Sequence, residues 1–121
     1  MRREALRSLG KLRERAPLDS RAVVPLLLHG LTDADIGVRT VSATYLGILH
    51  DDGPAVVPVL IETLQDENAE VRAAAATALG SFEAQAAQAL PALKKAAGDR
   101  DENVAREAGL SIVKLQSSSR K

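Results

Sequence analysis

The sequence contains no cysteine and no tryptophan, and only one tyrosine, one phenylalanine and one methionine among its 121 residues. The lack of cysteine excludes disulfide bonds and thiolate chemistry. Aromatic residues make up only 2% of the chain, so its core must be built from aliphatic side chains and alanine. Such a core favours closely packed helices over a sandwich or a barrel. No apolar run approaches the roughly 18–20 residues of a membrane span.

The chain also lacks an excess of either charge, since 16 basic residues balance 16 acidic ones. The charges are unevenly distributed along the sequence. Residues 1–22 have a net charge of +4 (seven basic, three acidic), residues 23–70 of −7 (one and eight), and residues 71–121 of +3 (eight and five). This asymmetry either steers a charged partner or reflects variation on solvated helix faces.

The sequence repeats itself with a period of 33 residues. Residues 22–54 align without a gap on residues 55–87, and 13 of these 33 positions are identical. A weaker third copy covers residues 88–115. Because one period holds two helices and a short repeat cannot bury its apolar faces alone, the repeats are expected to stack. The residues that recur in all three copies are Pro25, Pro58 and Pro91; Leu27, Leu60 and Leu93; Asp33, Asp66 and Asp99; and Val38, Val71 and Val104.

Each repeat is predicted to form two helices. Apolar residues recur at helical spacing, Asp, Asn and Gly mark the joins, and the period-two alternation of strands is missing. The first helices are expected over 20–31, 54–65 and 86–97, and the second helices over 35–50, 68–83 and 101–116.

The first residues align with the second half of a repeat, because Arg2 falls on Arg39 and Gly10 on Gly47. This orphan helix would leave an apolar face uncovered, so we expect that the chain either is a fragment of a longer array or self-associates through that end. The polar segment SSSRK is expected to be a disordered tail. The predicted limits are one domain over 1–116, made of the orphan half repeat 1–16 and repeats at 17–51, 52–84 and 85–116, followed by the tail 117–121.

The repeat resembles the HEAT-like repeats, of the short kind found in phycobilin-lyase-type proteins. The resemblance rests on the proline in the first helix, the aspartate in the turn, and Val-Arg opening the second helix (Val38-Arg39, Val71-Arg72) before Leu-Gly. The third repeat departs from the pattern, since Val104-Ala105-Arg106 moves the arginine by one place. The period also suits ankyrin and tetratricopeptide repeats, but the T-P-L-H-x-A string and most of the expected aromatic residues are missing.

This resemblance implies an all-α fold, a right-handed α–α solenoid of about seven helices. In the family the first helices line the convex side and the second helices line the concave side. Small side chains on the second helices, as in the stretch VRAAAATALG over 71–80, would allow these helices to approach closely.

The repeated aspartates and arginines have either a binding role or a structural one. The spacing of Asp33 and Arg39, repeated in Asp66 and Arg72, favours a structural role. We expect the turn aspartate to cap the second helix and to accept hydrogen bonds from the arginine of its own or the neighbouring repeat. The three recurring prolines, Pro25, Pro58 and Pro91, are expected to bend the first helices.

No motif for catalysis or cofactor binding is found in the sequence. Both phosphate-loop patterns, GxGxxG and GxxxxGK[ST], are missing. The only histidines, His29 and His50, have no partner at metal-ligand spacing. The sequence therefore predicts a protein that is not an enzyme and has neither cofactor nor metal.

The predicted function is a non-catalytic, cytoplasmic interaction or scaffold module that binds another protein on the concave face. Two alternatives remain open. One is binding of a nucleic-acid phosphate backbone by the basic N-terminal helix, and the other is an accessory role for a lyase-type enzyme. Candidate partner-binding residues, chosen by helical position, are Arg3, Arg7, Thr40, Thr44, Ala73, Thr77 and Glu83.

Overall fold

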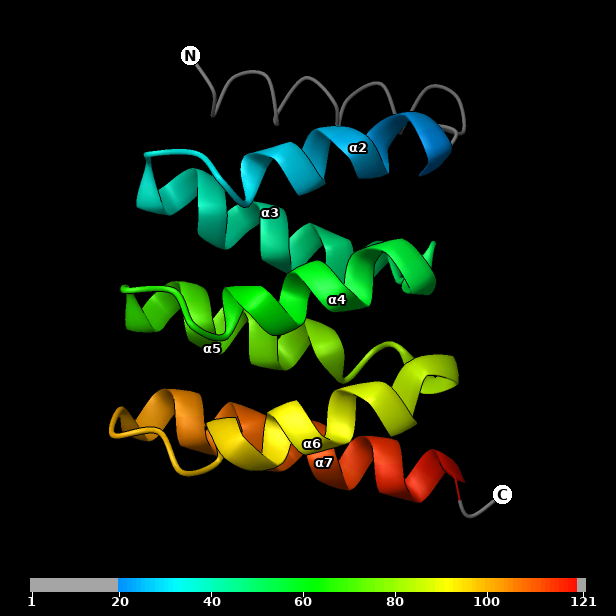
Figure 1. The fold of residues 1–121 in the computed structure, drawn as a ribbon, viewed down its shortest axis with the longest axis vertical. Coiled ribbons are helices and arrows are strands. Elements are labelled where there is room, and N and C mark those ends of the chain that lie inside the picture. Colours follow the sequence, from blue (N-terminus) through cyan, green and yellow to red (C-terminus); the bar gives the residue numbers. More distant parts are fainter. Residues whose placement is uncertain (1–19, 120–121) are drawn as a thin grey trace.

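The computed structural model describes residues 20–119, which form a column of helices (Figure 1). The predicted orphan helix over 1–16 lies outside these residues. None of the helices in the described part is both long and apolar enough to span a lipid bilayer. The described elements are α2 (Ser20–Gly30), α3 (Ile36–Leu49), α4 (Gly53–Thr63), α5 (Ala69–Leu79), the 3-10 helix η1 (Glu83–Gln85), α6 (Ala86–Ala96) and α7 (Glu102–Ser119).

The helices form three pairs, α2–α3, α4–α5 and α6–α7, stacked along the long axis of the molecule (Figure 1). The second helices of the pairs pack extensively on one another, α3 on α5 and α5 on α7, whereas the first helices contact one another much less. The stack is therefore packed most closely along its second helices. This confirms the all-α stack of helix pairs that the sequence predicts.

The second helices differ from the prediction at their ends. Helix α5 stops at Leu79 instead of residue 83. After it, the amides of Ser81 and Phe82 donate to carbonyls three residues earlier, and the side chain of Phe82 enters the core. Helix α3 is one residue shorter than predicted at each end, and it is followed by the C-cap residue His50, whose backbone is left-handed (φ 36°).

The C-terminal end of the chain also differs from the prediction. Helix α7 continues to Ser119, so the disordered tail predicted from Ser117 is wrong for Ser117–Ser119. The helix has no reason to stop earlier, because neither glycine nor proline follows Gly109 and the buried Leu115 anchors the last turns. The rest of the predicted tail, 120–121, lies outside the described residues.

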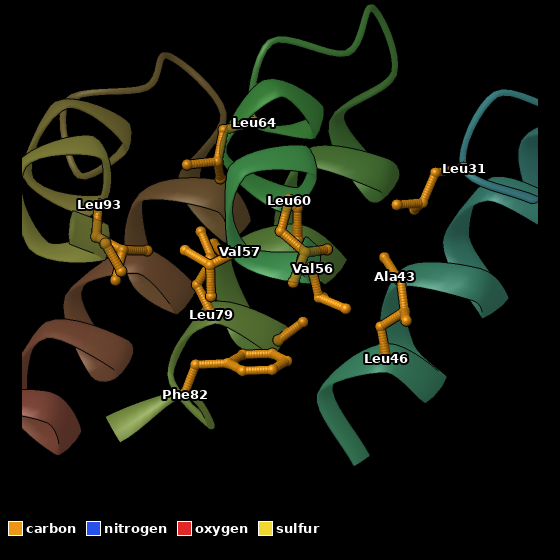
Figure 2. Packing of buried hydrophobic residues seen from close by; sticks show 14 of the residues in the cluster. Leu31, Ala43, Leu46, Val56, Val57, Leu60, Leu64, Leu79, Phe82 and Leu93 are labelled. Carbon is orange, nitrogen blue, oxygen red and sulfur yellow. The ribbon is translucent and has the colours of Figure 1, made fainter. Parts of the chain in front are cut away.

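The core is continuous from one repeat to the next. Figure 2 shows Val56, Val57 and Leu60 between Ala43 and Leu46 on one side and Leu93 on the other. Apart from Phe82, the buried cluster consists of aliphatic side chains and alanines, as the composition predicts.

Small residues bring the second helices together. A Cβ atom added to Gly47 would lie only 2.7 Å from the Cα of Ala78 on the next second helix. Ala75 and Ala76 have no exposed surface. The small side chains of the alanine-rich α5 therefore let it pack closely against α3 on one side and α7 on the other.

The recurring prolines lie within the first helices, on their exposed side. Pro25, Pro58 and Pro91 occupy equivalent positions in α2, α4 and α6. A proline removes one helical hydrogen bond, and an exposed position lets water satisfy the carbonyl that is left over. The bend predicted for these helices stays a prediction.

Candidate functional site

In each turn between a first and a second helix, two side chains that are two residues apart accept backbone hydrogen bonds. The turn aspartates Asp33, Asp66 and Asp99 each accept the backbone N–H two residues later, at 2.8–2.9 Å. The prediction that these aspartates cap the second helices is wrong. The helices begin at positions 36, 69 and 102, so the cap falls two residues after the aspartate. The capping side chains are those of Asp35, Asn68 and Asp101.

An arginine on each of the first two second helices joins its own turn to the next turn. Arg72 donates from Nε to Asp99 Oδ2 (3.0 Å) and from Nη2 to Asp99 Oδ1 (3.2 Å). Its Nη1 donates to the backbone carbonyl of Asp66 in its own turn (2.8 Å). The guanidinium therefore fixes the spacing between two turns, as a planar fork does well.

The same arrangement occurs one repeat earlier. Arg39 Nη2 donates to Asp66 Oδ1 (3.3 Å), and Arg39 Nη1 donates to the carbonyl of Asp33 (2.8 Å). Arg39 Nε lies 3.0 Å from Asp66 Oδ2 but makes no hydrogen bond, so this pair is the less well aligned of the two. The predicted arginine–aspartate contacts are thus confirmed, with the carboxylate supplied by the neighbouring repeat.

The better aligned pair, Arg72–Asp99, also lowers the pKa of its carboxylate. Hydrogen bonds from Arg72 and from the Asp101 amide hold the pKa of Asp99 below its ordinary value of 3.8. Only 16% of each side chain is exposed, so solvent screens the pair partially.

The third repeat does not continue this chain of ion pairs. Ala105 occupies the position of Arg39 and Arg72, and the neighbouring Arg106 is largely exposed. Arg106 bonds instead to Asn103 (2.9 Å) and lies 3.7 Å from Glu107 on its own helix. The shift of the arginine by one place in the third repeat therefore means that no arginine of this repeat forms the equivalent ion pair.

Four of the predicted partner-binding residues share one face of the stack. Thr40 and Thr44 lie on α3, and Ala73 and Thr77 lie at equivalent positions on α5. The hydroxyls of Thr40 and Thr44 donate to carbonyls one turn earlier, both at 2.9 Å. The hydroxyl of Thr77 shares its one proton between the Ala73 carbonyl (3.0 Å) and Glu107 Oε1 (2.9 Å). The hydroxyl protons are therefore engaged within the protein.

The remaining predicted residues lie elsewhere. Arg3 and Arg7 are outside the described residues. Glu83 was expected on the second helix but is the first residue of η1, because α5 ends earlier. Its role in partner binding stays a prediction.

The same face contains apolar residues that the sequence analysis missed. Positions spaced by four along each second helix, together with Ser81 just after the end of α5, form what we call the second-helix stripe. Ile48 and Leu110 in this stripe are 55% and 59% exposed, and Ile36 is 43% exposed. An alignment of the three repeats gives a signal for these residues, because small or polar residues (Ala69, Ser81, Thr44 and Thr77) occupy the equivalent positions in other repeats. The stripe comprises Ile36, Thr40, Thr44 and Ile48; Ala69, Ala73, Thr77 and Ser81; and Glu102, Arg106, Leu110 and Lys114.

The part of the stripe on repeats 1 and 2 carries no charge, although charged residues make up 26% of the chain. Charged side chains enter the stripe only with α7, at Glu102, Arg106 and Lys114. The stripe therefore changes from apolar at α3, through small residues at α5, to mixed charge at α7.

A separate hollow of about 370 Å³ lies at the end of α3 and is lined by His50, Ser81, Phe82, Glu83 and Lys114, among others. A serine hydroxyl becomes an effective nucleophile when an adjacent base accepts its proton. Within the described residues Ser81 and His50 are not bonded to each other, and the imidazole Nδ1 of His50 lies 3.1 Å from the Ile48 carbonyl. Across residues 20–119, no three His, Asp or Glu side chains gather closely enough to hold a metal ion.

Comparison with known protein families finds a match to HEAT repeats over residues 1–68 and 57–120. A search among curated proteins finds no match. The family match covers nearly the whole chain and agrees with the stacked helix pairs, and the match is to HEAT repeats in general. On the evidence of its period, its stacking and this match, the chain belongs to the HEAT-repeat family.

Proposed function

We propose that this chain is a non-catalytic module that binds another protein along the second-helix stripe. HEAT repeats generally act as protein-interaction scaffolds. Helical solenoids commonly bind partners on a concave surface, and we assign that surface here to the second helices.

The exposed apolar side chains of the stripe carry this proposal. Ile36 and Ile48 stand at the two ends of α3, and Leu110 lies on α7. Exposed apolar groups gathered on one face, with polar groups at the margin, mark interaction sites more often than isolated ones do. The uncharged stretch over α3 and α5 adds a surface that a partner can cover without desolvating a charge.

The nucleic-acid alternative has little support among the described residues. The basic positions that it requires lie in the N-terminal segment, outside the described residues, and residues 23–70 have a net charge of −7. An acidic surface repels a phosphate backbone. The lyase-accessory alternative has no supporting observation in the described part of the chain.

Two substitutions in the stripe test the proposal, with one control outside it. The protein would be used to capture partners from a lysate, and the captured proteins would be quantified for each variant. We expect Ile48→Glu and Leu110→Glu to lose a partner that the wild type retains, because a buried unpaired carboxylate is costly. Leu26→Glu is the matched control, since Leu26 on α2 is as exposed as Leu110 (59% each) and lies on a first helix.

A partner that is retained equally by all three variants, or lost equally by all three, would contradict binding along the stripe. A salt titration with DNA and RNA separates the alternative. Binding that weakens steeply with salt and survives Ile48→Glu would favour a nucleic-acid partner.

A further inference from the structure

The turns between first and second helices lie along one edge of the stack, at the left in Figure 1. On this edge repeats 2 and 3 carry opposite charges at equivalent positions. Glu62 in repeat 2 corresponds to Lys95 in repeat 3, and Glu67 corresponds to Arg100. All four residues are exposed. Repeat 2 is therefore acidic where repeat 3 is basic.

A hollow of about 580 Å³ lies between these two turns. Glu67 lines it on the repeat-2 side, and Lys95 and Arg100 line it on the repeat-3 side. The Arg72–Asp99 pair also lines the hollow, but its charges already compensate each other. Within the described residues, none of the four charged side chains at the equivalent positions forms an ion pair. Their charges are therefore available to a partner.

The arrangement restricts what can bind across the hollow. A partner with one sign of charge would be attracted by one wall and repelled by the other. A matching surface must present basic groups to repeat 2 and acidic groups to repeat 3. The same edge of a second copy, turned by a two-fold axis, presents this pattern, and a two-fold interface requires such a self-complementary surface.

We propose that the edge formed by the turns of repeats 2 and 3 binds the same edge of a second copy, with the two-fold axis passing through the hollow. In this dimer Glu62 and Glu67 of each copy face Lys95 and Arg100 of the other. The proposal goes beyond the proposed function, because this edge is separate from the second-helix stripe and leaves the stripe open to another partner.

The dimer is expected to be weak and sensitive to salt. Its contacts join exposed charges, which contribute little individually and are screened by ions. The small side chains of Ala92 and Ala96 in the hollow allow the edges to approach. The chain has no net charge, so two copies do not repel each other at long range.

Charge-reversed variants test this geometry by sedimentation velocity over a range of protein concentrations. We expect the acidic variant (Lys95→Glu with Arg100→Glu) and the basic variant (Glu62→Lys with Glu67→Arg) to be monomers alone. For each variant alone the dissociation constant should rise at least about tenfold, because like charges then face each other. An equimolar mixture of the two variants should form a dimer again, since every facing pair is then of opposite sign. The wild-type dimer should weaken from about 50 mM to about 500 mM salt.

A matched control carries the same change in net charge away from this edge. Arg106→Glu with Lys114→Glu alters α7 by the same four units of charge and should weaken the dimer far less than the acidic variant does, because the changed residues do not face the second copy. Far-ultraviolet circular dichroism on every variant would verify that the helices are retained. Wild-type protein that stays monomeric at low salt, a dimer that survives both charge reversals, or a mixture that stays monomeric would each overturn the proposal.

Discussion

Equivalent sequence positions hold different residues at the boundaries between repeats and on the outward face of the third repeat, which is the face of α7 turned away from α5. At the boundary between repeats 1 and 2, Gly47 lets the next second helix approach and Arg39 reaches the next turn. On the outward face of the third repeat, Val113 takes the place of the glycine and is 61% exposed, and Ala105 takes the place of the arginine.

Within the third repeat, by contrast, the positions that shape the helix pair are retained. Pro91, Asp99 and Val104 keep their places, and Val104 is fully buried. The difference shows that repeats 1 and 2 keep the residues that contact the following repeat, whereas repeat 3 keeps those that hold its own helix pair together. Stability in such a stack is the sum of terms within repeats and terms between them, and the two kinds can be tested separately.

The largest expected difference in the free energy of unfolding is between variants of Arg72 and of Arg106, which lies one place after the position equivalent to Arg72. Arg72→Ala should lower the free energy of unfolding by about 2–3 kcal/mol, because it leaves a partly buried carboxylate without its cation. Arg106→Ala should cost less than about 0.5 kcal/mol, since its contacts are exposed. Urea unfolding followed by circular dichroism measures both. Equal costs would mean that the chain of ion pairs does not hold the repeats in place.

A second comparison concerns two alanines on α5. Ala75 is fully buried between layers, whereas Ala73 is only half-buried and belongs to the second-helix stripe. Ala75→Leu should destabilise the protein by about 1–3 kcal/mol, because the closely packed helices must separate. Ala73→Leu should cost far less. The same urea titration compares them, and similar costs would show that α5 is rotated relative to the described arrangement.

A third comparison concerns two helical glycines. A Cβ at Gly47 would meet the backbone of Ala78, whereas a Cβ at Gly109 would meet nothing within 4 Å. Gly47→Ala should therefore destabilise by about 1–3 kcal/mol. Gly109→Ala should stabilise by up to about 1 kcal/mol, because alanine is the better helix former. Thermal melting of both variants should show shifts in opposite directions, and shifts of the same sign would contradict the distinction between boundary and outward face.

The sequence analysis succeeded where a feature recurs within each repeat. The period predicted the helix pairs, and the predicted first helices differ from the observed ones by at most two residues at either end. It failed at the caps, because Asp33 and Asp35 are both suitable acceptors and periodicity does not show at which residue the helix begins. It also extended α5 too far, since Phe82 fits the helical spacing of core residues but is buried from the segment that follows the helix.

Contacts between repeats were harder to predict. Arg39 and Asp66 are 27 residues apart, and only the stacking distance decides whether an arginine reaches its own turn or the next. The guanidinium does both, since it binds a carbonyl of its own turn and a carboxylate of the next. Ile36 and Ile48 were overlooked because apolar residues at helical spacing look like core residues until the stack shows which face is exposed.

The smallest expected effect is the pH dependence of the boundary between repeats 2 and 3. The pKa of Asp99 is lowered in the folded protein, so the folded state binds this proton less readily than the unfolded state. The stabilisation from this group is therefore complete above the ordinary pKa of 3.8 and is lost as the pH falls through the lowered pKa. The difference in unfolding free energy between wild type and Arg72→Ala should shrink over that range.

This difference should not vanish in acid, because Arg72 also donates to the carbonyls of Asp66 and Glu67, which do not titrate. The difference between wild type and Arg106→Ala provides the control and should stay small throughout. Urea titrations from neutral pH down to about pH 2 give both differences, the lower limit lying below the ordinary range of aspartate. A constant difference for Arg72→Ala would mean that its bonds to the turn carbonyls, and not its charge on Asp99, hold the two repeats together.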